Sequence, residues 1–216
     1  MTLHPDVMSQ SQRELLRRLG PVASKEGFYL GGGTSLALQL GHRRSLDLDW
    51  FGEKPMGDPL LLANRIRDAG TVLVVEAVDE GTLHADAVGT RVSFFEYRYP
   101  LLRPLVRWEE YGCMLASLED LACMKLAAIA GRGDKRDFVD VDALAGRDME
   151  FAEMLDLYRQ KFEVRDIGHL LFSLTYFDDA DQTSLPEMLH DVDWAQVKRR
   201  LQDQVRAFVQ RGKSPE

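Results

Sequence analysis

Residues 31–35 read Gly-Gly-Gly-Thr-Ser, and residues 45–49 read Ser-Leu-Asp-Leu-Asp. The first segment predicts a glycine turn that opens a helix, and the second predicts a strand that carries two acids. Side chains alternate between the two faces of a strand, so Asp47 and Asp49 share a face, about 6.6 Å apart along the backbone. Asp is a poor strand former, so this pair favours a cation-binding role over a plain solvent-facing strand side.

The glycine turn offers a complementary group for phosphate. Glycine lets a ligand approach the backbone closely, and a helix start presents amide groups with partial positive charge. We therefore expect Gly32, Gly33 and Thr34 to contact phosphate; a tight strand-to-helix turn with no ligand is the alternative. Ser45 either bonds a phosphate oxygen or satisfies its own loop.

Together the two segments predict a metal-dependent site for a nucleotide. Asp47 and Asp49 would bind two Mg²⁺ ions, with Mn²⁺ as a substitute. The metal would neutralise a triphosphate and activate an attacking oxygen for in-line displacement.

A second charged group lies further along the chain. Lys125 stands in an apolar stretch, seven residues before Arg132, so the two share a helix face, and Asp137 and Asp140 share another. One interpretation is an ion pair between two helices. The other places Lys125 and Arg132 on the triphosphate and Asp137 beside the base, the sugar or the acceptor.

The composition is that of an ordinary globular protein. The chain has 216 residues, 45% of them hydrophobic, and a formal net charge of −8, which argues against non-specific coating of nucleic acid. No apolar run reaches the roughly 18 residues of a membrane span, and the N-terminal residues lack a signal-peptide pattern. Cys113 and Cys123 have no metal-ligand spacing. We expect a cytoplasmic protein with reduced thiols and no membrane partner.

The predicted secondary structure differs between the two halves of the chain. The first half predicts alternating helices and strands with a mixed sheet: a helix over 7–19 that ends at Gly20-Pro21, strands at 28–30, 46–51, 71–78, 82–87 and 91–97, and helices at 34–40 and 60–69. The second half predicts helices at 117–130, 134–144, 151–162, 166–177 and 191–210. We therefore expect an α+β fold with two domains, residues 1–112 and 113–216.

The segment from Gly32 to Phe51 resembles the signature of the AbiEii/AbiGii family of nucleotidyltransferase-like toxins, and residues 125–140 resemble that family's second block. The resemblance implies a DNA polymerase β-like nucleotidyltransferase core, followed by a helical domain that completes the active site. By the same resemblance Asp47 and Asp49 match the metal-binding acids. Gly33, Thr34 and Ser45 match the phosphate-side motif, and Lys125 and Asp137 match the later active-site pair.

One departure from the wider fold concerns a third metal-binding acid, which that fold supplies from a later strand. The best alignment puts Ser93 at this position. Glu96 is nearby, but it falls on the opposite face of the strand unless a bulge intervenes. His84 is taken as an ordinary surface histidine. With two acids, catalysis is slow, relies on Asp137, or is absent.

The resemblance implies transfer of a nucleoside monophosphate from an NTP to a hydroxyl of RNA, above all tRNA, or of a protein, by the toxin of a toxin–antitoxin pair. Its expected partners are an NTP, a tRNA acceptor and an antitoxin. The alternative is a weak or inactive nucleotide-binding or interaction module on the same fold.

Overall fold

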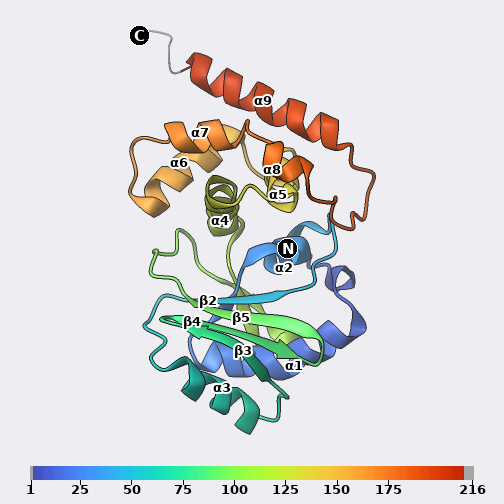
Figure 1. Ribbon diagram of the computed structural model, residues 1–216, viewed down its shortest axis with the longest axis vertical. Helices are drawn as coiled ribbons and strands as arrows, with labels where there is room; N and C mark the ends of the chain where they lie inside the picture. Colours follow the sequence, from blue (N-terminus) through green and yellow to red (C-terminus); the bar gives the residue numbers. More distant parts are fainter. Residues whose placement is uncertain (1, 212–216) are drawn as a thin grey trace. The chain divides into compact units, whose positions relative to one another are not determined.

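The structure, a computed structural model, describes residues 2–211. The chain separates into two compact units, residues 1–121 and 122–216 (Figure 1). The first unit is built on one mixed sheet of seven strands in the order β3-β4-β5-β2-β1-β7-β6. The strands are β1 (Tyr29–Leu30), β2 (Leu48–Gly52), β3 (Val74–Asp79), β4 (Thr82–Ala87), β5 (Thr90–Glu96), β6 (Val106–Trp108) and β7 (Cys113–Leu115).

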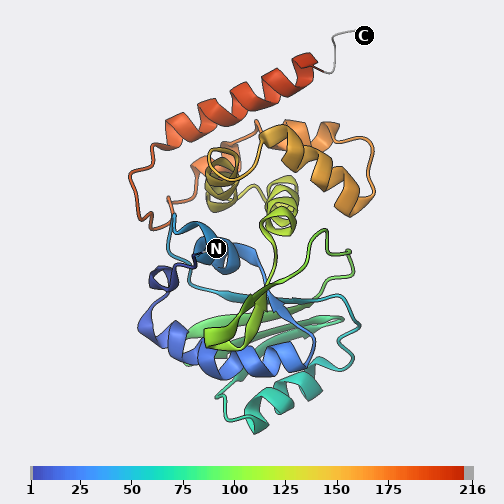
Figure 2. The ribbon, with the colours of Figure 1, turned by 180° about the vertical axis from the view of Figure 1, so that it is seen from behind.

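The helices of the first unit include α1 (Gln10–Lys25), α2 (Gly32–Leu40) and α3 (Pro59–Asp68). Short 3-10 turns are η1 (Pro5–Val7) and η2 (Glu109–Tyr111). Both α1 and α3 lie on the same side of the sheet, as the view from behind also shows (Figures 1 and 2). The core of this unit therefore lies between these helices and one face of the sheet.

Alternation along the strands decides which side chains face that core. On β2, Leu48 and Trp50 are fully buried, whereas Asp49 between them is only half-buried. On β5, Val92 and Phe94 are buried in the same way. The acids of β2 consequently belong to the face of the sheet turned away from the apolar core.

The predicted end of the first helix at Gly20-Pro21 is wrong, because α1 continues through Pro21 to Lys25. A Cβ atom at Gly20 would lie 2.3 Å from the carbonyl oxygen of Tyr111, so this glycine allows close packing rather than ending the helix. The chain turns instead at Gly27, whose φ of +87° is readily adopted by glycine.

The end of the first unit differs from the predicted boundary at residues 112/113. β7 pairs in parallel with β1, with Leu115 opposite Leu30, and antiparallel with β6. Residues 113–115 therefore belong to the sheet and not to the helical part. The sequence analysis missed both strands, because three residues are too few to show an alternating pattern.

The second unit consists of helices. α4 (Leu118–Gly131) begins at the end of the first unit, where Ser117 Oγ accepts a hydrogen bond from the Asp120 amide at 3.0 Å, as expected of an N-cap. The other helices are α5 (Lys135–Ala145), α6 (Phe151–Phe162), α7 (Gly168–Ser173), α8 (Asp178–Asp181) and α9 (Trp194–Arg211). The predicted α+β class with a helical C-terminal part is confirmed. Within residues 2–211, no helix has both the length and the hydropathy to cross a membrane.

Candidate nucleotide and metal site

Two half-buried carboxylates lie at the start of the central strand β2. Asp47 directly precedes the strand, Asp49 is its second residue, and both are half-buried. Asp49 lies opposite Ser93 of β5, and its carbonyl oxygen accepts a hydrogen bond from the Gly31 amide at 2.9 Å. Pairing on both sides therefore fixes the backbone that carries the acids.

The glycine turn lies directly against Asp49. A Cβ atom at Gly32 would lie 2.8 Å from Asp49 Oδ2, and one at Gly33 would lie 2.6 Å from Arg43 Nη2. Gly32 also has a φ of +60°, which side chains disfavour. Glycine is thus favoured at Gly32 by its backbone conformation, and a side chain at Gly33 would displace the Arg43 guanidinium group.

The start of α2 has the features of an anion site. Its N-cap is Gly31, which has no side chain to accept a hydrogen bond from the first turn of amides. The amides at a helix start carry partial positive charge, so a phosphate can take the place of a capping side chain.

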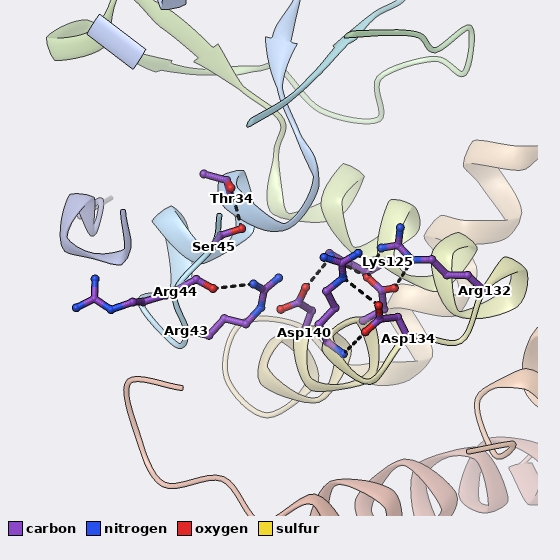
Figure 3. A network of polar contacts seen from close by, with 10 residues as sticks. Thr34, Arg43, Arg44, Ser45, Lys125, Arg132, Asp134 and Asp140 are labelled. Atoms are coloured by element: carbon purple, nitrogen blue, oxygen red, sulfur yellow. Dashed lines mark hydrogen bonds and ion pairs between the residues drawn. The ribbon is translucent and has the colours of Figure 1, made fainter. Parts of the chain in front are cut away.

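Thr34 and Ser45 connect the helix start to the loop before β2. Thr34 Oγ1 lies 2.8 Å from Ser45 Oγ (Figure 3). The same oxygen also contacts the carbonyl oxygen of Asp47. Ser45 is buried, and its carbonyl oxygen accepts a hydrogen bond from Gln12 Nε2 at 2.9 Å. The loop-satisfying role left open for Ser45 is therefore present. Contact of Thr34 or Ser45 with phosphate stays a prediction.

Arg43 is a residue that the sequence analysis did not single out. Its side chain is buried, its Nη1 donates to the Arg44 carbonyl oxygen at 2.9 Å, and its Nη2 lies beside Gly33 (Figure 3). A guanidinium group at this point adds positive charge beside the helix start. The run of basic residues at 42–44, between the glycines and the acids, was the available signal in the sequence.

The strand beside β2 carries no acid at the aligned position. Ser93 is buried opposite Asp49, and Glu96 lies three residues further along a strand whose pairing with β2 and β4 has no bulge. Glu96 accepts a hydrogen bond from the Met56 amide at 2.9 Å. This bond and the contact with Arg98 hold the pKa of Glu96 below its usual range. The Glu96 side chain therefore bonds the loop that contains Met56, on the face of the sheet opposite to that of Ser93, as the spacing of the two residues predicts.

The second unit contains a buried charge cluster of its own. Lys125 Nζ lies 2.9 Å from Asp137 Oδ1 and 2.6 Å from Asp140 Oδ2, and Arg132 pairs with both oxygens of Asp137 at 2.8 and 3.0 Å (Figure 3). Asp137 and Asp140 are fully buried, whereas the Arg132 side chain is half-exposed. The ion pair proposed as one interpretation is present; a catalytic role for Lys125, Arg132 and Asp137 stays a prediction.

The pKa of Asp137 reflects this pairing. Burial alone would raise the pKa, but the charge of Lys125 and the hydrogen bond and charge of Arg132 outweigh burial and hold the pKa below the ordinary value of 3.8. The carboxylate therefore remains ionised despite its burial.

The residues of the first unit fit a divalent cation bound with a nucleotide. Carboxylate oxygens are the ligands that Mg²⁺ prefers, and Mg²⁺ is commonly held by one or two carboxylates together with substrate phosphates. At Gly32 and Gly33 the side chains of Asp49 and Arg43 come so close to the turn that an added Cβ atom would lie 2.8 Å from Asp49 Oδ2 or 2.6 Å from Arg43 Nη2, so a carboxylate and a cation stand beside the helix start. Within residues 2–211, no group of three or more His, Cys, Asp or Glu side chains is arranged to hold a metal. The available protein ligands are thus two carboxylates.

The chain resembles known proteins over most of its length. Residues 14–102 and 86–211 match the family described as "Nucleotidyl transferase AbiEii toxin, Type IV TA system". An uncharacterized protein of Aquifex aeolicus (strain VF5) is 33% identical over 208 residues, which cover 94% of this chain and 98% of that protein.

Two solved structures share the fold. MenT4, a nucleotidyltransferase toxin from Mycobacterium tuberculosis H37Rv, gives a TM-score of 0.62 at 17% identity over 93% of this chain and 82% of MenT4. JHP933 from Helicobacter pylori gives a TM-score of 0.54 at 16% identity over 97% of this chain and 94% of JHP933. At these identities the two structures establish a common fold and nothing further.

The family match extends over most of the chain, and the chain therefore belongs to the AbiEii family of nucleotidyltransferase toxins. The family predicted from the glycine turn and the two acids is confirmed.

Proposed function

We propose that this member of the AbiEii family transfers a nucleoside monophosphate from an NTP to a hydroxyl group of an RNA, with tRNA as the first acceptor to test and a protein hydroxyl as the alternative. The observation that carries the proposal is the position of the Asp49 carboxylate, 2.8 Å from where a Cβ atom at Gly32 would stand, with the Arg43 guanidinium group beside Gly33. A helix start, a cation and two carboxylates at one place suit a metal-bound triphosphate.

In this proposal each candidate site residue of the first unit has a defined role. Asp47 and Asp49 hold Mg²⁺, or Mn²⁺ in its place. The amides of Gly32 and Gly33 and the Arg43 guanidinium bind phosphate oxygens, and Thr34 and Ser45 hold the turn in shape. When bound, Mg²⁺ supplies charge neutralisation and lowers the pKa of a hydroxyl that it contacts. The acceptor oxygen forms a bond to the α-phosphorus, and the bond from that phosphorus to pyrophosphate breaks.

The proposed biological setting follows from the family. We propose that the chain acts in the cytoplasm as the toxin of a toxin–antitoxin pair, in which nucleotide transfer to RNA stops growth. Expression of the chain with and without the neighbouring gene tests this setting: growth arrest relieved by the neighbour supports it, and unimpaired growth overturns it.

Incubation of the protein with labelled NTPs, Mg²⁺ and a tRNA pool tests the transfer. The proposal predicts label on tRNA, which is lost on chelation of Mg²⁺ and in the variant Asp47→Asn/Asp49→Asn. Asp79→Asn is a matched control, because Asp79 is an exposed acid at the end of β3. Equal labelling by the wild type and the double variant would contradict the proposal, and label on protein alone would select the alternative acceptor.

A second candidate is a nucleotide-binding module without transfer. It is favoured by Ser93, which stands where the fold supplies a third acid. Binding of an NTP with Mg²⁺ but no label on any acceptor would select this candidate.

A further inference from the structure

Three polar side chains lie in one row across the sheet of the first unit. His84 of β4 is the register partner of Ser93 of β5, and Ser93 is the register partner of Asp49 of β2. Partners in register project from the same face of a sheet. Neighbouring strands are about 4.8 Å apart, so the backbones of His84 and Asp49 are separated by about 10 Å. His84 therefore belongs to the same face as Asp49 and is not an isolated surface residue.

The His84 ring is held by two contacts. Its Nδ1 lies 3.0 Å from Ser93 Oγ, and its ring packs edge-on against Phe95 at a centroid distance of 5.5 Å and an angle of 74°. Ser93 is 2% exposed, whereas His84 is half-buried. Of the two, only His84 has an accessible edge, so Ser93 serves to orient the ring.

We propose that His84, oriented by Ser93, accepts the proton of the attacking hydroxyl in place of the absent third carboxylate. This inference rests on the proposed transfer reaction. Nδ1–H donates to Ser93 Oγ, which leaves the lone pair of Nε2 as the proton acceptor. As the hydroxyl oxygen bonds to the α-phosphorus and pyrophosphate leaves, the O–H bond breaks and the proton passes to Nε2. No further reactant is required.

The other candidates on this part of the sheet fit the role less well. Glu96 lies on the opposite face and is bonded to Met56 and Arg98. Asp86 lies two residues after His84 on β4, but its Oδ1 accepts a hydrogen bond from the Gly89 amide at 2.9 Å in the hairpin turn. His84, in contrast, lies 3.0 Å from Ser93 Oγ, and Ser93 is the residue opposite Asp49 in the sheet.

Transfer kinetics test the role of His84. His84→Gln is expected to lower the rate of transfer about 10²–10⁴-fold, the usual contribution of a general base, while NTP affinity measured by calorimetry stays unchanged. Exogenous imidazole should restore transfer to His84→Ala, and Ser93→Asp should restore it in the His84→Gln background by returning a carboxylate to the third position. His169→Gln is the matched control, because His169 is an exposed histidine of α7.

A second readout does not depend on activity. In ¹H–¹⁵N spectra of the imidazole, the wild type should show His84 as the Nδ1–H tautomer, and Ser93→Ala should shift it toward Nε2–H. An Nε2–H tautomer in the wild type would overturn the inference.

The kinetic outcomes separate the inference from the proposed function. A wild type that labels no acceptor overturns both. A wild type that labels tRNA together with an equally active His84→Gln variant overturns the inference alone. A His84→Gln variant that loses NTP affinity as well as transfer also overturns it, because His84 would then act in binding.

Discussion

The two charged clusters of the chain differ in how their charges are compensated. In the first unit, Asp47 and Asp49 are half-buried acids beside a helix start that has no side-chain cap. In the second unit, Lys125 and Asp137 are buried and bonded to each other. The first arrangement places half-buried acids next to an uncapped helix start, as suits a ligand reached from solvent, whereas the second is a buried network of two carboxylates with a lysine and an arginine. Charge spacing in a sequence therefore does not by itself distinguish a binding site from a structural ion pair.

Substitution of Asp49 should lower the rate of transfer strongly and change the stability of the protein little. Asp49→Asn should lower transfer by on the order of 10³-fold, because loss of a metal ligand removes several kcal/mol of charge stabilisation. Its free energy of unfolding should change much less than that of Lys125→Met, because Asp49 is half-buried rather than fully buried and asparagine keeps the size of the side chain. Labelling kinetics and urea unfolding of the same preparations measure both. A strongly destabilised Asp49→Asn protein would remove the contrast between the clusters.

Substitution of Lys125, in contrast, should lower the stability of the protein strongly. Lys125→Met leaves two buried carboxylates without their shared lysine, which typically costs about 3–5 kcal/mol of stability. Urea unfolding measures this loss. Arg206→Ala is the matched control, since its pair with Asp203 is exposed and contributes about 0–1 kcal/mol. A Lys125→Met protein as stable as the wild type, yet unable to transfer, would move Lys125 into the catalytic group.

A smaller effect is expected at the glycine turn. Gly33→Ala places a Cβ atom 2.6 Å from Arg43 Nη2 and so displaces the guanidinium group from the phosphate site. We expect NTP affinity to fall about tenfold, which corresponds to about 1.4 kcal/mol. Gly131→Ala is the control, because a Cβ atom there has no neighbour within 4 Å. Unchanged affinity in Gly33→Ala would show that the turn does not approach the nucleotide.

The smallest effect concerns acid stability. The native pKa of Asp137 lies below its ordinary value of 3.8, so the unfolded chain takes up this proton first as the pH falls. The stability due to Asp137 is therefore complete above pH 3.8 and is lost as the pH drops through the native pKa. Urea unfolding between pH 5 and pH 2.5 should show a shallower decline for Asp137→Asn than for the wild type. Parallel declines would mean that the pair contributes little.

The sequence was informative where chemistry and local geometry coincide. The glycine turn, the acids of β2 and the caps at Ser117 and Asp134 follow from residue type and short spacing. The continuation of α1 through Pro21 does not follow from residue type and short spacing, because it depends on packing against Tyr111, which is far away in the chain.

Prediction from the sequence has the same limit at the candidate site. His84 and Arg43 acquire their places through strand register and through the fold of a loop, neither of which leaves a local pattern. The ion pairs of Lys125 fit both interpretations of its spacing, so only the three-dimensional contacts show which partners it has.

The most direct test of the central claim is calorimetry of NTP binding with and without Mg²⁺. We expect the wild type to bind at least one of the four NTPs only when Mg²⁺ is present. The variant Asp47→Asn/Asp49→Asn, folded as judged by its urea transition, should not bind it. Absence of Mg²⁺-dependent binding for every NTP in the wild type, or undiminished binding by the double variant, would contradict the central claim.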